Sequence, residues 1–174
     1  INSVTGKNVS TTADVGIYAD EIEILSPVAG TDGTGDGFLE SNYDITYVPG
    51  DLTINRRAIT LTANDQSKTY GDALNLGSTS FSVADKGDAQ DSVLPNDEEI
   101  DTVTLVSANG VDASTDADVK TYTGNISITP TATGAATLAG SNGFDQENYD
   151  ISYATGDLTI ARRAITLTAS GQSK

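Results

Sequence analysis

The feature that most constrains this chain is an internal repeat. Residues 42–68 (NYDITYVPGDLTINRRAITLTANDQSK) and residues 148–174 (NYDISYATGDLTIARRAITLTASGQSK) are identical at 21 of 27 positions, with an offset of 106 residues. Residues 10–18 also match residues 114–122, with an offset of 104. Repeats of this length are expected to fold as domains rather than as single turns of a solenoid. The two-residue difference between the offsets is expected to fall in a surface loop.

The repeat divides the chain into three parts. We expect residues 1–56 to form the C-terminal part of one repeat, residues 57–161 a complete repeat domain, and residues 162–174 the first strand of the next repeat. The sequence is therefore expected to come from a longer tandem array.

Alternating side chains predict strands along most of the chain. Ile59 and Leu61 alternate with Thr60 and Thr62, and the same period of two recurs around Ile22, Ile45, Leu52, Phe81, Val103 and Ile126. This pattern is typical of strands with one buried face. The fold class that we predict is mostly β, with tandem small antiparallel β domains. Each domain is expected to be sandwich-like; a β-grasp-like domain with one short helix at 88–93 is the alternative.

Two glycine-containing turns are predicted to close hairpins. Asn109-Gly110 follows the strand-like run TVTLVS, and Asn-Gly is a strong signal for a tight hairpin. Thr155-Gly156 separates the alternating segments NYDISY and DLTI, as Pro49-Gly50 does in the other copy. We expect a hairpin at each of these positions.

The junction between repeats has no flexible linker. Buried positions are even-numbered up to Ile54 and odd-numbered from Ile59, so two strands with different inward faces meet there. A connection this short predicts a stiff rod of domains. All four arginines of the chain lie at such junctions, namely Arg56, Arg57, Arg162 and Arg163. We hypothesise that they pair with carboxylates of the neighbouring domain, with Asp51 and Asp157 as candidates; the alternative is that they are solvated charges that protect strand ends from aggregation.

Composition excludes several classes of function. The 174 residues carry 25 acidic and 9 basic side chains, a formal charge of −16. Such a chain repels nucleic-acid phosphates, so we expect no nucleic-acid partner. It has no Cys and no His, which removes thiol and imidazole catalysis and the usual zinc or haem ligands. No apolar run approaches the length of a membrane span, so we expect no membrane insertion by this segment.

Clustered carboxylates are the candidate metal ligands. The densest stretch, residues 85–101, includes Asp85, Asp88, Asp91, Asp97 and Glu98, and a glycine-rich stretch holds Asp32 and Asp36. Calcium takes six to eight oxygen ligands from such loops, so calcium is a possible cofactor. Neither stretch has the EF-hand pattern, and the alternative is that both are solvated loops that keep an acidic chain soluble. Paired carboxylates also serve glycosidases, but the chain has no Trp and few aromatics to line a sugar cleft, so we expect no enzyme.

The motifs together resemble a known family. The strings AITLTANDQSKTYGD and DVKTYTGNISITP and the closing NYDISYATGDLTIARR are similar to the MBG-type tandem repeats of large bacterial surface adhesins. The resemblance covers nearly the whole chain, although the acidic stretch 85–101 departs from the shorter members. It implies an extracellular location on a bacterial surface, tandem arrays, a compact β-rich module and no catalysis.

These observations favour a structural role. We expect a non-catalytic repeat of an extracellular adhesin or fibre that acts as a stiff spacer or filament module. The alternative is a calcium-dependent module that binds a glycan or a protein. Its expected partners are neighbouring repeats, and copies of itself through strand exchange, because an unpaired β edge is a template for another strand.

Overall fold

The computed structural model describes residues 2–24, 43–85, 94–129 and 138–174. The chain forms two compact units, unit 1 (Ile1–Arg56) and unit 2 (Arg57–Lys174). The candidate metal ligands Asp32, Asp36, Asp88 and Asp91 and the predicted helix at 88–93 lie outside the described residues.

The described residues of unit 1 form one small antiparallel sheet. Its strands are β1 (Asn2–Ser3), β2 (Gly16–Glu23) and β3 (Gly50–Ile54), in the order β1-β2-β3, and a 3-10 turn, η1, covers Lys7–Val9. Among the side chains of unit 1 that the structure describes, only Ser3 and Glu21 are buried. This sheet therefore has no hydrophobic core of its own in the described residues.

In unit 2, the part of the chain that the structure describes forms short strands in three sheets. The sheets have the strand orders β11-β4-β6, β5-β12-β9-β8 and β10-β7. The strands are β4 (Arg57–Ala63), β5 (Gln66–Thr69), β6 (Phe81–Asp85), β7 (Glu99–Thr102), β8 (Leu105–Ser107), β9 (Thr121–Ile128), β10 (Ala139–Ser141), β11 (Tyr149–Ala154) and β12 (Gly156–Ala161). The helical elements are 3-10 turns, η3 (Pro95–Asp97), η4 (Ala108–Gly110) and η5 (Gln146–Asn148). The described chain is thus mostly β and holds no α-helix, so no helix there is long or apolar enough to cross a membrane.

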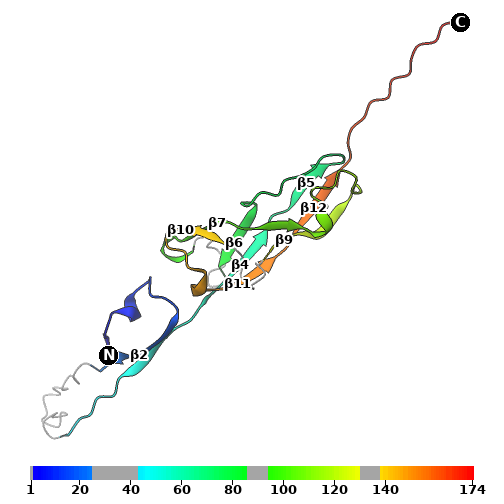
Figure 1. Cartoon of the computed structure of the whole chain (residues 1–174). Coiled ribbons are helices and arrows are strands. Elements are labelled where there is room, and N and C mark those ends of the chain that lie inside the picture. Colours follow the sequence, from blue (N-terminus) through cyan, green and yellow to red (C-terminus); the bar gives the residue numbers. More distant parts are fainter. Residues whose placement is uncertain (1, 25–42, 86–93, 130–137) are drawn as a thin grey trace, which may run out of the picture. The chain divides into compact units, whose positions relative to one another are not determined.

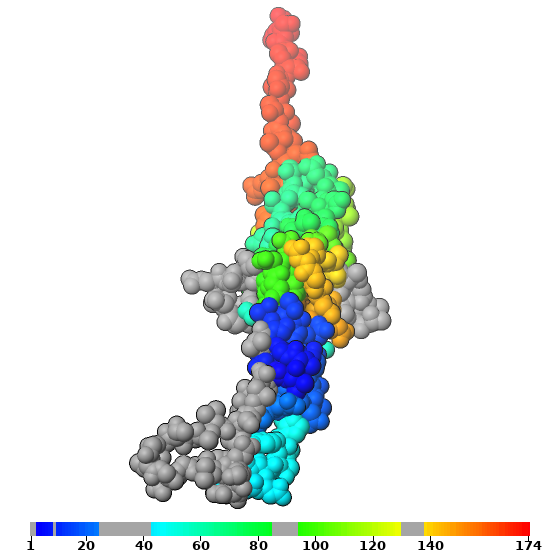
Figure 2. All heavy atoms as spheres, turned by 90° about the vertical axis from the view of Figure 1, so that its left-hand side faces the viewer, coloured from blue at the N-terminus to red at the C-terminus, as the bar shows by residue number. Residues whose placement is uncertain are grey.

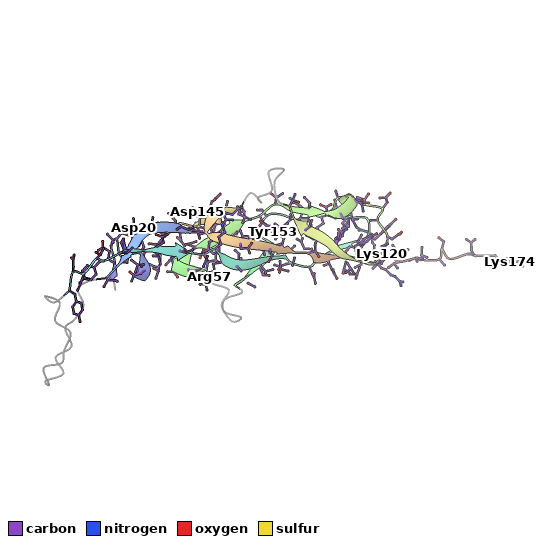
Figure 3. The ribbon with its side chains drawn as sticks, turned by 90° about the horizontal axis from the view of Figure 1, so that it is seen from below. Asp20, Arg57, Lys120, Asp145, Tyr153 and Lys174 are labelled. Carbon is purple, nitrogen blue, oxygen red and sulfur yellow. The ribbon has the colours of Figure 1, made fainter. Side chains whose placement is uncertain are left out.

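The first two strands of unit 2 run beside its last two strands in the same direction (Figure 1). Strand β4 pairs with β11 from Arg57 opposite Tyr149 to Thr62 opposite Ala154. Strand β5 then pairs with β12, ending with Thr69 opposite Ala161. At about 3.3 Å per residue, this paired path is about 40 Å long. The chain therefore comes into unit 2 at one end and leaves at the other; in Figure 3, Arg57 and Lys174 mark these two sides.

The two paired segments, 57–69 and 149–161, pass from the first sheet to the second at the same point along their length. Ile59, Leu61 and Ala63 are buried in the first sheet, whereas β5 and β12 belong to the second sheet. Gly156 lies where the strands cross, and a Cβ added there would lie 2.4 Å from the Ala63 carbonyl oxygen. The backbone amide of Asp157 also donates to the Asp65 carboxylate, at 2.7 Å. Close backbone approach therefore requires glycine at position 156.

The buried apolar side chains form one cluster. Both the three-stranded sheet β11-β4-β6 and the four-stranded sheet β5-β12-β9-β8 contribute to it. Its fully buried members are Ile59 and Leu61 from β4, Ile126 from β9, and Leu158 and Ile160 from β12. All the buried apolar residues of the described chain belong to unit 2. Burial of one such side chain stabilises a fold by about 1.5–3 kcal/mol, so this cluster is a main source of the stability of the unit.

Three details of the sequence prediction are corrected. The domain is not purely antiparallel, because β4–β11 and β5–β12 are parallel pairs. Thr155-Gly156 does not close a hairpin, because β11 and β12 lie in different sheets. Asn109 and Gly110 do form a turn with positive φ angles, 58° and 63°, but they do not close a two-residue hairpin. The turn lies in the long connection from β8 to the next strand, β9, which pairs with β8 antiparallel (Leu105 opposite Ile128).

Gly156→Ala should destabilise unit 2 through the clash with the Ala63 carbonyl. Overpacking of this kind costs about 1–3 kcal/mol, and the upper part of that range is expected because the obstacle is backbone. The matched control is Gly50→Ala in unit 1, the equivalent position in the repeat, where the nearest atom to an added Cβ is the Ile22 Cβ at 3.9 Å. That change should stay within about 0.5 kcal/mol.

The measurement is urea unfolding of dilute protein followed by circular dichroism. Equal losses for the two variants would show that Gly156 has no special packing role.

Candidate functional site

The motif Lys-Thr-Tyr-Gly-Asp at 68–72 forms a turn at the outgoing end of unit 2, and we call it the exit turn. The backbone amide of Tyr70 donates to the Ala161 carbonyl at 2.8 Å, which extends the pairing of β5 with β12 by one bond. The amide of Asp72 donates back to the Thr69 carbonyl at 3.0 Å. Gly71 has a φ of +91°, a conformation that favours glycine.

The exit turn holds Arg163, which lies two residues after the last strand. The Arg163 Nε donates to the Tyr70 carbonyl at 2.7 Å, and its Nη2 forms an ion pair with the Asp72 carboxylate. A Cβ at position 71 would lie 3.2 Å from the Arg163 Nε, so the glycine also leaves room for the guanidinium. Both charged side chains are about half exposed. The turn therefore fixes the direction in which the chain leaves unit 2.

Lys68, in the same motif, is buried. Its ammonium group donates to three backbone carbonyls of one loop: those of Val111, of Asp112 at 2.9 Å and of Ser114 at 2.5 Å. Hydrogen bonds from a charged donor stabilise more than neutral ones, and these bonds satisfy the buried charge. Lys68 therefore ties strand β5 to loop 111–114.

The carboxylates that we expected near the arginines, those of Asp51 and Asp157, accept hydrogen bonds from backbone amides. The Asp157 carboxylate accepts the Gly124 amide at 2.8 Å, and the Asp51 carboxylate accepts the Asp20 amide at 3.1 Å in the equivalent place of unit 1. Gly124 and Asp20, whose amides donate these bonds, have positive φ angles and lie where the strand pairing is irregular. These aspartates therefore stabilise bulges in the sheets.

Of the other three junction arginines, two lie where unit 1 meets unit 2 in the sequence, and one lies just after the last strand of unit 2. Arg56 is the last residue of unit 1, Arg57 is the first residue of β4, and Arg162 precedes Arg163 in an exposed extended segment. Both Arg56 and Arg57 make contacts within the structure.

Among the predicted calcium ligands, the structure describes the side chains of Asp97 and Glu98 alone. Asp85 ends strand β6, and its side chain lies outside the description. The Glu98 carboxylate accepts the Tyr149 hydroxyl at 2.7 Å, and the Asp97 carbonyl accepts the Asn142 side-chain amide at 2.9 Å. Among the described residues, no three His, Cys, Asp or Glu side chains are grouped to hold a metal ion. A calcium site in 85–101 or 30–37 stays a prediction.

Sequence reasoning missed a buried carboxylate in unit 1. Glu21 accepts hydrogen bonds from the Ser3 hydroxyl, the Thr5 hydroxyl at 2.7 Å and the Thr5 amide at 3.0 Å. The Ser3 hydroxyl is the main reason that the pKa of Glu21 is lowered to about 2. The offset of 104 places Glu21 at the position of Asn125 in unit 2, where Ser107 donates to the Asn125 side chain at 2.5 Å. Aligning the repeats would have revealed this polar position inside the sheet.

Comparison with known proteins gives no match to this chain among protein-family models, curated proteins or solved structures.

The contact between Asp72 and Arg163 should be measurable by a double-mutant cycle. We expect Asp72→Asn and Arg163→Ser to be coupled by about 0.5–1 kcal/mol, the usual value for a half-exposed ion pair. Salt should reduce this coupling through screening. The measurement is the free energy of unfolding at low and at high ionic strength.

The control cycle combines Arg163→Ser with Asp150→Asn. Asp150 pairs with Ala58 at the incoming end of unit 2, so its coupling to Arg163 should be near zero. Equal coupling in both cycles would show that the ion pair adds nothing specific.

Proposed function

We propose that this chain is a tension-bearing structural repeat of an extracellular tandem array on a bacterial surface. The observation that carries the proposal is the parallel pairing of residues 57–69 with residues 149–161. These segments contain the first two and the last two strands of unit 2, and the chain enters the unit at one end of the pair and leaves it at the other. A pull along the array would therefore act along the strands.

The direction of pull decides how the unit resists. When two parallel neighbours are pulled from opposite ends, their ladder of hydrogen bonds is loaded in shear and many bonds must fail together. When the same strands are pulled from one end, the bonds fail one after another. The buried Ile59 and Leu61 on β4 and Leu158 and Ile160 on β12 add packing to the same ladder.

The exit turn would transmit the pulling force from the last strand to the next repeat. Arg163 is fixed by the Tyr70 carbonyl and the Asp72 carboxylate directly after the last paired residue, Ala161. The motif that holds Arg163 is part of the string on which the resemblance to MBG-type adhesin repeats is based. In this account, the motif sets the angle between consecutive repeats.

Other features agree with an array outside the cell. The formal charge of −16 favours solubility and extension of a long chain of domains. The two larger sheets of unit 2 share one apolar cluster, which supports a sandwich-like repeat over the β-grasp-like alternative. The repeat needs no catalytic group for this role.

Single-molecule pulling with two attachment geometries tests the proposal. The chain has no Cys, so introduced cysteines give unique handles. Handles at Asn55→Cys and Ser170→Cys load the parallel strands in shear, whereas handles at Asn55→Cys and Asp150→Cys open β4 from β11 at one end. We expect unit 2 to unfold at a several-fold higher force in the first geometry. Similar forces in both would contradict the proposal.

A further inference from the structure

An Asn-Gly dipeptide forms the turn in the loop that follows β8. Asn109 and Gly110 have φ angles of 58° and 63°, and both are exposed. Asn-Gly is chemically unstable, because the small glycine lets its amide nitrogen attack the side-chain carbonyl carbon of the asparagine. The sequence has two such dipeptides, and the second, Asn142-Gly143, also has positive φ angles, 56° and 87°. Unit 2 therefore offers two sites for the same reaction.

The reaction needs no reactant other than water. The Gly110 amide nitrogen loses its proton and bonds to the Asn109 Cγ, and the bond from Cγ to Nδ2 breaks, so that ammonia leaves. The product is a five-membered succinimide ring. Water then adds to one of the two ring carbonyls, which gives either aspartate or isoaspartate. Both products carry a new negative charge, and isoaspartate also has one more carbon atom in the main chain.

The native turn holds Asn109 away from this reaction. The ring closes only when the glycine nitrogen is turned toward the asparagine Cβ about the Cα–C bond. The ψ angle of Asn109 is 20°, which places the Gly110 nitrogen close to the backbone nitrogen of Asn109 instead. Asparagine tolerates this left-handed conformation, so the turn itself is stable. The main chain must therefore rotate, and the loop must open, before the ring forms.

The loop is fixed on both sides of the dipeptide, and we call residues 107–114 the anchored loop. Before the dipeptide, the Asn125 side-chain amide donates to the Ala108 carbonyl at 3.2 Å. After it, the buried Lys68 ammonium group donates to the Val111 carbonyl and to two more carbonyls of the loop. The anchored loop thus lies beside the exit turn, at the end of unit 2 from which the C-terminal segment, in red, projects (Figure 2).

We propose that Asn109-Gly110 is a self-modification site whose reaction the anchored loop controls. While the loop is closed, Asn109 keeps its amide; when the loop opens, the dipeptide converts to aspartate or isoaspartate. The longer main chain of isoaspartate lies between the Asn125 and Lys68 anchors, so the loop does not close again in its native form. The chain then retains a covalent record of opening. This inference goes beyond tension bearing and does not depend on it, since any cause of opening has the same effect.

The reactive pair is specific to one copy of the repeat at this position. At the offset of 104, unit 1 has Thr5-Gly6 in place of Asn109-Gly110, and Gly6 also has a positive φ angle, 78°. Thr5 instead donates to the Glu21 carboxylate. Unit 1 is therefore an internal reference without the reactive amide.

Peptide mapping by mass spectrometry tests the proposal. The full chain is incubated at mildly alkaline pH, either folded or in urea, and is then digested with trypsin. Cleavage at Lys86, Lys120 and Arg162 places the two Asn-Gly dipeptides on separate peptides. Conversion is read from the mass difference between an amide and an acid. We expect Asn109 to convert at least about tenfold more slowly in the folded chain, since local opening limits the reaction.

Lys68→Met tests the control by the anchored loop. Without this anchor, Asn109 in the folded chain should convert about tenfold faster, because a charged donor to buried carbonyls is lost. Asn142 should not respond, since its side-chain amide donates to the Asp97 carbonyl at 2.9 Å, away from this loop. The matched control is Lys7→Met, which removes a lysine of unit 1 and should change neither site.

A second variant covers the case in which Lys68→Met unfolds unit 2. Unfolding would accelerate both Asn-Gly sites equally, so the ratio of the two rates identifies it. Ser107→Ala then decides, because it removes only the hydroxyl that accepts the Asp112 amide at 3.2 Å and bonds the side chain at the first anchor. Asn109 should again accelerate relative to Asn142.

Hydrogen exchange tests the covalent record. In a partly converted sample, peptides that contain isoaspartate separate from those that contain asparagine. We expect the isoaspartate form to lose protection at the amides of Asp112 and Ser114, which bond Ser107 and Gly110 in the closed loop. Asn109→Asp is the charge-matched control: it has the new charge without the longer main chain, and it should stay protected.

Three results would overturn the proposal. One is conversion of Asn109 at the same rate in the folded chain and in urea. Another is no preferential acceleration of Asn109 over Asn142 in either anchor variant. The third is an isoaspartate form whose loop amides are as protected as those of the unchanged chain.

Discussion

The parallel pairing of residues 57–69 with residues 149–161 is the interaction on which the rest of unit 2 depends. It joins the two ends of the unit in sequence, and it places the central strands of both larger sheets. Because the segments change sheet together at Ala63 and Gly156, one pair of chains connects two sheets and one apolar cluster. Loss of this pairing would open both sheets, so local changes along it have global effects.

The same pairing explains why nearly identical sequences have different environments. In unit 2 both members of the pair are present, and Ile59 and Leu61 are buried. In the described residues of the other copies, Leu167, the equivalent of Leu61, is 90% exposed, and β3, the equivalent of β12, pairs with β2 alone. Apolar burial here is thus a property of the pair, because neither segment buries its residues without the other.

Much of the fold was predictable from the sequence. Period-two alternation located β4, β6, β9 and β12, because a half-buried strand requires it, and the change of phase between Ile54 and Ile59 marked the short connection from β3 to β4. The partner of each strand was not predictable in this way. A glycine between two alternating segments is as consistent with a hairpin as with a strand that crosses from one sheet to another. At Gly156 the strand crosses between sheets, and the reason is a tertiary contact with Ala63 that the sequence does not reveal.

The candidate site was predictable only in part. The junction arginines stood out because a very acidic chain places all its arginines there. The partner of Arg163 did not stand out, since Asp72 lies 91 residues away in sequence and comes close to it only through the parallel strands. The role of Lys68 could not be predicted, because its partners are backbone carbonyls, which leave no pattern in the sequence.

Disulfide trapping tests the central pairing most directly. Thr60 and Ser152 lie opposite each other, with their hydroxyl oxygens 3.0 Å apart, so cysteines there fall within the geometric range of a disulfide. The chain has no other Cys. Mild oxidation of the variant Thr60→Cys with Ser152→Cys should give a rapid crosslink within one chain, whereas Thr60→Cys with Asp150→Cys, two residues out of register, should not. Crosslinking of the second pair, or of neither, would contradict the parallel register and the account built on it.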